Sequence, residues 1–304
     1  MTDIFEQYMI STNPTGYWRL EELSGGTAQD SSGNANHGNY VNVARGYPSG
    51  IPATPDSYGG NFQNSGHRVT IPGFRGKMNS ANWSMGCWFR ATSSYSNWPR
   101  IMGAFDFNVS GISFVMNRNN GAIFAEGHAA GHFGFGGTPA YWDGNWHFLV
   151  LTQDNNTLNL YGDGNNYGTT TRGGLVTYPG QDLTLGTHAT ETGDDFIGQI
   201  DEAAWWDRTL TPQEIQDIYD VGMLTKTLYT ISGTVTVGGV HSRRQINIHN
   251  RETGRLVGTG YSEEDGTYSI PVATDEECYV VIMEDKFNQK YESRVKDFAI
   301  PVPV

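Results

Sequence analysis

Residues 196–222, with the sequence FIGQIDEAAWWDRTLTPQEIQDIYDVG, contain a strand pattern followed by a helix signal. The period-two alternation of a strand over residues 196–207 places Ala203 and Trp205 on one face and Trp206 on the other. Because both faces carry apolar side chains, we expect both to be covered. The pattern therefore predicts a strand inside a sheet rather than at its edge.

The residues after this strand predict a helix of about two turns. Thr211 supplies a hydroxyl N-cap, Pro212 takes the first helical position and Glu214 at N3 completes a capping box. An apolar face begins at Ile215, and Gly222 is placed to end the helix. We expect this helix to close a large N-terminal domain.

On the N-terminal side, short apolar runs alternate with Gly, Asn, Asp and Pro, which is typical of a β-sandwich or barrel. The composition agrees, because 39 Gly, 16 Tyr, 14 Phe and 8 Trp in 304 residues suit turns and half-buried pleated faces. Further strands are predicted at residues 17–20, 68–71, 83–90, 112–117, 122–126, 146–153, 157–163 and 183–186.

Strict alternation begins at residue 229, and the remaining length suits a small sandwich. Strands are predicted at residues 229–237, 245–250, 256–261, 267–270 and 278–284. Hairpin connections with a positive-φ glycine are predicted at residues 251–254 and 263–266. The predicted organisation is a helical or irregular lead-in over 1–12, a large domain over 13–222, a linker over 223–228 and an immunoglobulin-like sandwich over 229–304.

The charge balance disfavours nucleic-acid binding, because 32 acidic and 19 basic residues give a net charge of -13 that repels phosphates. Cys87 and Cys278 fall in different predicted domains, so we expect two buried thiols and no disulfide scaffold. The N-terminus lacks a secretion signal, and no run approaches the roughly 20 apolar residues of a membrane span. Action outside a cell would then require release in an assembled particle, or another export route.

Six motifs in order carry a resemblance to a known fold family. They are residues 17–22 (YWRLEE), 30–38 (DSSGNANHG), 82–89 (NWSMGCWF), 143–148 (DGNWHF), 158–164 (LNLYGDG) and 196–215. Together they resemble the laminin-G-like, concanavalin-type jelly-roll domains of microbial surface proteins and phage virion proteins. This resemblance implies an all-β fold with two packed antiparallel sheets.

Residues 13–16 (NPTG) resemble the start of such domains in tailed-phage structural proteins. The C-terminal motifs 232–235 (SGTV), 252–257 (ETGRLV) and 265–268 (DGTY) are similar to small sandwiches of phage tail proteins and carboxypeptidase-regulatory-like modules. The combination implies a virion structural protein, tail-associated or a decoration, assembled in the host cytoplasm and exposed on the particle in multiple copies. Its expected partners are other capsid or tail proteins, or a host cell-surface glycan.

Two alternatives are a carbohydrate-binding module protein of a surface or secreted polysaccharide system, and a glycan-cleaving enzyme. The sequence pairs 21–22, 194–195 and 201–202 are acidic, but neighbouring strand residues point to opposite faces, which does not suit an acid/base pair. Carboxylates from separate loops could still converge. The sequence contains no HExxH, P-loop or GxSxG motif, and we expect no enzyme activity.

A calcium site is predicted at Asp30, Asn34, Asn36 and Asp201. Ca²⁺ takes six to eight oxygen ligands from carboxylates, amides and backbone carbonyls. The resemblance implies calcium where the DSSG loop meets the IDE strand. An Asx-turn at Asp30 and a hydrogen-bonded Asp201 would explain the same residues without a metal.

A ligand-binding surface is predicted from aromatic and histidine residues in two Gly- and Ser-rich segments, because exposed aromatic rings stack on sugars. Its residues are Tyr95, Trp98, His128, His132, Tyr141 and Trp142. The alternative is that these side chains hold long loops in place or pack against a neighbouring subunit. His147 is expected to be a structural histidine with satisfied hydrogen bonds.

Overall fold

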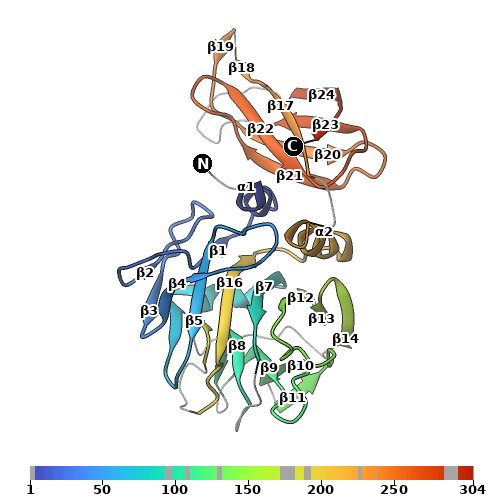
Figure 1. Ribbon diagram of the computed structural model, residues 1–304. Helices are drawn as coiled ribbons and strands as arrows, with labels where there is room; N and C mark the ends of the chain where they lie inside the picture. Colours follow the sequence, from blue (N-terminus) through green and yellow to red (C-terminus); the bar gives the residue numbers. More distant parts are fainter. Residues whose placement is uncertain are drawn as a thin grey trace. The chain divides into compact units, whose positions relative to one another are not determined.

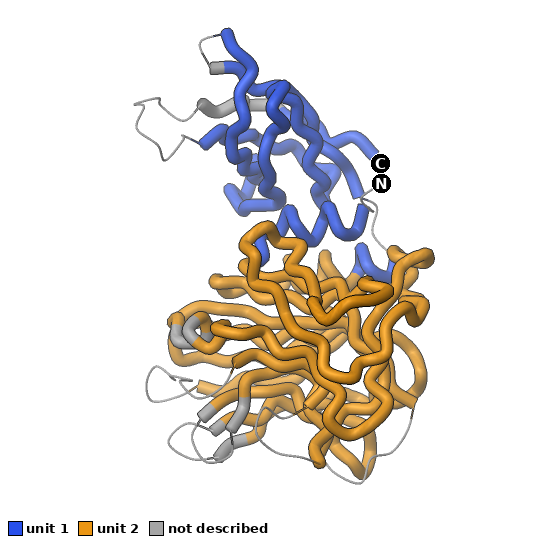
Figure 2. Tube along the Cα trace, turned by 90° about the vertical axis from the view of Figure 1, so that its left-hand side faces the viewer, with its two compact units in different colours: residues 1–14, 220–304 blue, residues 15–219 orange. Residues whose placement is uncertain are grey.

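The computed structural model is all-β with antiparallel sheets, as predicted (Figure 1). The structure describes residues 4–92, 98–106, 110–128, 132–171, 182–187, 193–224, 228–237, 239–283 and 294–303. The chain forms two compact units, one of residues 15–219 and one that combines residues 1–14 with 220–304 (Figure 2). No described helix is long and apolar enough to cross a membrane.

Two antiparallel sheets build the large unit as a jelly-roll sandwich. Sheet A has the order β14 (Asn165–Thr171), β13 (Thr157–Gly162), β12 (Trp146–Asp154), β7 (Asn82–Arg90), β16 (Gly198–Trp206), β5 (Tyr58–Phe62) and β4 (Ala44–Pro48), with β1 (Gly16–Trp18) paired to β16. Sheet B has the order β11 (His132–Phe135), β10 (Ile123–His128), β9 (Ser110–Met116), β8 (Arg100–Asp106), β15 (Leu183–Leu185), β6 (Arg68–Ile71), β3 (Gly38–Val41) and β2 (Thr27–Ala28). A 3-10 helix, η1 (Phe74–Asn79), precedes β7.

The core of the large unit is rich in tryptophan. Trp83 and Trp205 stack with ring centroids 5.0 Å apart, and Trp18 is fully buried in the same cluster. β16 lies between β7 and β5, and its Trp205 and Trp206 are both fully buried. The prediction of an internal strand with two covered faces is therefore confirmed.

The helix α2 (Pro212–Gly222) begins where the capping box predicts. The Thr211 backbone N–H donates to Glu214 Oε2 over 2.8 Å, and the Glu214 N–H donates to Thr211 Oγ over 3.2 Å. The helix has 11 residues, about one turn more than predicted. Tyr219 stacks on Trp88 of β7 at 5.8 Å, so the helix contributes to covering the outer face of sheet A.

The small unit encloses its own core between two sheets. One has the order β22 (Thr267–Val272), β17 (Tyr229–Thr234) and β25 (Val302–Pro303), and the other β21 (Leu256–Tyr261), β20 (Gln245–Asn250), β23 (Cys278–Ile282) and β24 (Arg294–Ala299), with a separate hairpin of β18 (Thr236–Val237) and β19 (Val240–His241). Ile231, Ile246 and Val280 join in one core cluster. The immunoglobulin-like assignment stays a prediction.

An N-terminal helix belongs to this small unit. α1 (Ile4–Ser11) lies against β21 and β22, and its Phe5 and Met9 are fully buried. The lead-in predicted over residues 1–12 therefore contains a helix that packs on strands some 250 positions later in the chain. Sequence spacing alone does not reveal such an association.

Candidate functional site

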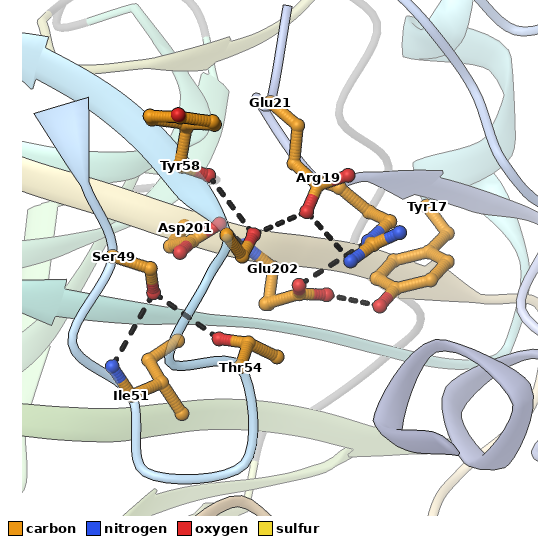
Figure 3. A network of polar contacts seen from close by, with 10 residues as sticks. Tyr17, Arg19, Glu21, Ser49, Ile51, Thr54, Tyr58, Asp201 and Glu202 are labelled. Carbon is orange, nitrogen blue, oxygen red and sulfur yellow. Dashed lines mark hydrogen bonds and ion pairs between the residues drawn. The ribbon is translucent and has the colours of Figure 1, made fainter. Parts of the chain in front are cut away.

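A buried polar network lies on sheet A around Glu202, which has no exposed surface (Figure 3). The Tyr17 hydroxyl donates to one oxygen of the Glu202 carboxylate, and Arg19 Nε lies 3.4 Å from the other. Arg19 also contacts Glu21 at 2.7 Å, and the Ser57 hydroxyl donates to the same Glu21 oxygen. The network thus joins β1, β16 and the loop before β5.

A β-bulge places two neighbouring carboxylates on the same side of β16. Ile200 and Ala203 both lie in the core, and the pairing with β7 shifts register between Asp201 and Ala204. Glu202 takes a positive φ of 49°, which an extended strand residue does not adopt. Strict alternation therefore fails here, and the expectation that adjacent acidic residues face opposite sides is wrong for this pair.

Asp201 is also fully buried. Its Oδ1 accepts the Glu202 backbone N–H over 2.8 Å, whereas its Oδ2 is buried without a hydrogen-bond partner among the described residues. Burial and the nearby Glu202 charge raise the pKa of Asp201 well above its usual range. Because neither carboxylate has exposed surface, neither can reach a glycosidic bond in this conformation.

The residues predicted to bind calcium are satisfied by one another. Both Asp30 carboxylate oxygens accept backbone N–H groups, from Tyr17 and Ser32 at 2.9 Å and from Asn36 at 2.8 Å. The side-chain amides of Asn34 and Asn36 both donate to the carbonyl of residue 15. This geometry is the Asx-turn alternative, because the donors occupy the oxygens that a cation would need.

Asp201, the fourth residue of the predicted calcium site, accepts the Glu202 backbone N–H through Oδ1, and its Oδ2 is buried without a hydrogen-bond partner in the part of the chain that the structure describes. Within the described ranges, no group of three or more His, Cys, Asp and Glu side chains could hold a metal ion. As arranged, these residues do not fit a calcium ion. No part of the function proposed below depends on calcium.

The predicted ligand surface is divided by the structure. Tyr95 and the side chains of His128 and His132 lie outside the described residues. Tyr141 is 4% exposed and belongs to the core, and Trp142 packs against that core. For Tyr141 and Trp142 the geometry supports the alternative, in which the rings hold loops in place.

Trp98 is partly exposed and lies beside sheet B. Its ring meets Phe124 edge-on at 5.8 Å, and the Arg118 guanidinium lies over it at 5.5 Å. Phe124 faces outward, because its neighbours Ile123 and Ala125 in β10 lie in the core. We call Trp98, Arg118 and Phe124 the Trp98 cluster.

A buried ion cluster lies on the same outer face of sheet B. Arg100, 2% exposed, is 3.2 Å from Glu126 and 3.7 Å from Asp194, and it donates to the Ser113 hydroxyl over 2.6 Å. Arg100 begins the strand that follows Trp98, so the cluster fixes the backbone beside the exposed ring. Arg118, Phe124 and Arg100 were not predictable as site residues, because nothing in the one-dimensional pattern brings their segments together.

His147 is a structural histidine, as predicted. Its Nε2 lies 3.0 Å from Asp143 Oδ1, its Nδ1 lies 2.8 Å from Asp163 Oδ2, and the Tyr141 ring stacks on it at 3.9 Å. Burial favours the neutral ring, but the hydrogen bonds and charges of Asp163 and Asp143 outweigh burial and raise the pKa of His147. The Asp143 pKa is lowered, because bonds from Asn145 and His147 outweigh its own burial.

Comparison with known proteins identifies the family. Residues 63–216, about half of the chain, match the family described as the concanavalin A-like lectin/glucanases superfamily. The chain belongs to this superfamily. No curated protein sequence matches the chain significantly. Membership agrees with the jelly-roll sandwich and with the fold family that the sequence motifs resemble.

Solved structures show the same fold in proteins of different kinds. One is domain 4 of a GH43 extracellular arabinanase from Geobacillus stearothermophilus, in complex with arabinotriose. It has 20% sequence identity to our protein and a TM-score of 0.53, and the match covers 68% of our protein and 98% of the arabinanase domain. The binding domain of Paraclostridial Mosquitocidal Protein 1 has 11% identity and a TM-score of 0.55, over 95% and 76% of the two chains.

Trypanosoma rangeli sialidase in complex with sialic acid has 14% identity and a TM-score of 0.55, over 69% of this chain. The match spans about a third of the sialidase, since 33% of that chain is covered. At these identities the likeness concerns the fold alone. The similar structures include parts of glycoside hydrolases and a binding domain. The likeness assigns no functional residue to this chain.

We expect Arg19→Met to cost the large unit about 3–5 kcal/mol, because it leaves the buried Glu202 carboxylate without its cation. The measurement is urea unfolding at pH 7 followed by tryptophan fluorescence, since all 8 Trp residues lie in the large unit. Lys77→Met is the control, because Lys77 and Asp207 form an exposed pair at 3.7 Å and its loss should cost about 0–1 kcal/mol. Equal losses in the two variants would refute the buried-pair interpretation.

The raised pKa of His147 predicts a pH-dependent stability. Its contribution is fully present below the unfolded pKa of about 6.5 and is lost as pH rises through the higher folded pKa. At pH 6, His147→Gln should therefore lower the free energy of unfolding by about 1–3 kcal/mol, and the difference from wild type should shrink toward pH 9. Denaturant titrations across this range test it, with the exposed His241→Gln as control. A pH-independent difference would contradict it.

Proposed function

We propose that this protein is a non-catalytic glycan-binding adhesion protein whose large unit contacts sugars through Trp98, Arg118 and Phe124. The observation that carries the proposal is the partly exposed Trp98 ring, held edge-on by Phe124 and flanked by an exposed guanidinium. Aromatic faces stack on the apolar faces of sugar rings, and arginine donates to their hydroxyls. The buried Arg100 ion cluster would keep this platform rigid, which lowers the entropic cost of binding.

The relatives support a sugar ligand without identifying it. Domain 4 of the arabinanase was solved with arabinotriose, so this fold is able to carry an oligosaccharide. Membership of a superfamily named for lectins and glucanases leaves both binding and cleavage open. We favour binding, because the acidic neighbours Asp201 and Glu202 are fully buried and Glu202 is held by Tyr17 and Arg19.

We further propose that the protein acts on the exterior of a phage particle, as a tail-associated or decoration protein in multiple copies. The support is the sequence resemblance of residues 13–22 and of the C-terminal motifs to virion proteins. There it would adhere to a host glycan or attach to other capsid or tail proteins. In the alternative, a carbohydrate-binding module protein of a surface or secreted polysaccharide system, the protein would bind sugars through the same residues but would not be part of a phage particle.

The glycan function predicts that Trp98→Ala weakens sugar binding and leaves the fold intact. The measurement is a glycan array screened with the full chain, followed by titration of the best ligand. We expect a loss of at least about tenfold in affinity, since a stacked aromatic anchor contributes more than about 1.4 kcal/mol. Tyr47→Ala is the matched control, because Tyr47 is 39% exposed on sheet A. Wild-type binding by Trp98→Ala would exclude this site.

The virion location predicts that a gold label on the C-terminus decorates the outside of particles from the producing host. Electron microscopy of purified particles is the measurement, and labelled protein added to unlabelled particles is the control for adventitious attachment. Recovery of the labelled protein only in the free fraction would contradict a virion role. It would favour the carbohydrate-module alternative if the free protein binds glycans.

A further inference from the structure

Four arginines lie in and next to the β20–β21 hairpin of the small unit. Residues 242–262 contain Arg243, Arg244, Arg251 and Arg255 and one acidic residue, Glu252. The whole chain, in contrast, has 32 acidic and 19 basic residues. Glu263, Glu264 and Asp265 follow this segment directly, and Arg251 lies 3.9 Å from Glu277. The attraction of an anionic partner is therefore confined to close contact with Arg243.

One face of this hairpin points away from the core of the small unit. In β20, Ile246 and Ile248 are fully buried in the core, so Gln245, Asn247 and His249 face outward. β20 pairs with β21 on one side and with β23 on the other, so the outward face includes residues of all three strands. Across it, Tyr261 pairs with Gln245, and Tyr279 pairs with His249.

Aromatic rings lie at both ends of the face. Tyr261 is 59% exposed, and the Arg243 guanidinium lies 5.5 Å from its ring centroid. At the other end, Tyr279 and His249 stack with centroids 5.1 Å apart and planes 8° from parallel. Four residues of strand separate the two ends, which corresponds to about 13 Å along β20. A ligand that contacts both ends must therefore be extended.

Polar side chains occupy the middle of the face. The Thr259 hydroxyl donates to Asn247 Oδ1 over 2.7 Å. Because this bond uses the amide oxygen, the side-chain nitrogen is the Asn247 group that would donate to a ligand. A sheet face with aromatic ends and an amide centre offers stacking and hydrogen bonding along one line.

We propose that the outer face of β21, β20 and β23 binds an extended acidic polysaccharide, with Tyr261 and Tyr279 stacking on sugar rings and Arg243 pairing with a carboxylate or sulfate. The guanidinium over Tyr261 brings charge and stacking surface to the same place, which matches a sugar ring that carries an acidic group. This site goes beyond the function proposed for Trp98, because it uses other residues in the other unit.

Charge complementarity selects the class of ligand. A neutral glucan would use the rings and the amide but not Arg243. A nucleic acid would also pair with arginine, but its dense phosphates are repelled by the net charge of -13. An acidic polysaccharide carries more widely spaced charges together with sugar faces, and it fits both features of the face.

The test is affinity electrophoresis of the full chain in native gels that contain polygalacturonate, with dextran and single-stranded DNA as the other probes. Retardation by polygalacturonate is expected. Tyr261→Ala and Arg243→Gln should each weaken it at least about tenfold, as expected for aromatic and arginine hot spots. Tyr47→Ala and Arg75→Gln are the matched controls, because they remove an exposed ring and an exposed charge from the large unit.

Each outcome decides the proposal. Loss of retardation in the Tyr261 and Arg243 variants, with both controls and Trp98→Ala retained as wild type, supports this second site. Absence of retardation by polygalacturonate, or retardation that these variants leave unchanged, overturns it. Stronger binding to dextran or to single-stranded DNA also overturns it, because the charge argument would then be wrong. If Trp98→Ala binds array glycans like wild type, the result overturns only the site proposed at Trp98 and leaves the site in the small unit untouched.

Discussion

The buried carboxylate of Glu202 is the constraint on which the arrangement of β1, β16 and the loop before β5 depends. An unpaired charge without solvent contact costs several kcal/mol, so Glu202 requires a cation and a donor close by. Arg19 and Tyr17 supply both, and the pairing of β1 with β16 puts them there. Arg19 also forms an ion pair with Glu21, which accepts a hydrogen bond from the Ser57 hydroxyl. The contacts around one buried charge therefore connect three segments that are far apart in the sequence.

The same constraint explains the bulge. A regular strand would send Glu202 toward the apolar core, where no partner exists for its charge. The extra residue and the positive φ of Glu202 keep Ile200 and Ala203 in the core while both carboxylates stay on the polar side. The cost of the unusual backbone is of order 1–3 kcal/mol, which is less than the cost of a carboxylate in the core.

Strands with long apolar runs were predictable, but β8 was missed although its Ile101, Met102 and Ala104 lie in the core. β7, β12 and β16 each carry long apolar runs, and their predicted ranges agree with the structure within two residues. β5 (YGGNF) was missed because its glycines remove the pattern. Gly59 suits this position, since a Cβ would lie tightly at 3.3 Å from Asp201 Oδ2 and 3.2 Å from the Ile200 carbonyl. β14 was missed because its side chains are mostly polar at the edge of sheet A.

The candidate sites were only partly predictable, because residue type does not determine exposure or partners. Tyr141 and Trp98 both read as ligand-binding aromatics, yet one is buried against His147 and the other stays partly exposed. Asp30 has a carboxylate that could bind calcium, but its oxygens accept hydrogen bonds from three backbone N–H groups. In each case the deciding contact comes from a segment that the one-dimensional pattern does not place.

Overall charge and local charge act on a ligand at different distances. The net charge of -13 repels an anionic glycan that approaches from solution, but salt screens this repulsion beyond about 8 Å at physiological ionic strength. Arg243 acts at contact distance, where screening is weak and the Tyr261 ring adds stacking surface. An acidic protein can therefore still present an arginine and an aromatic ring to an anionic ligand at contact distance. For this reason the sequence of residues 242–262 is more informative about ligands than the total charge of the chain.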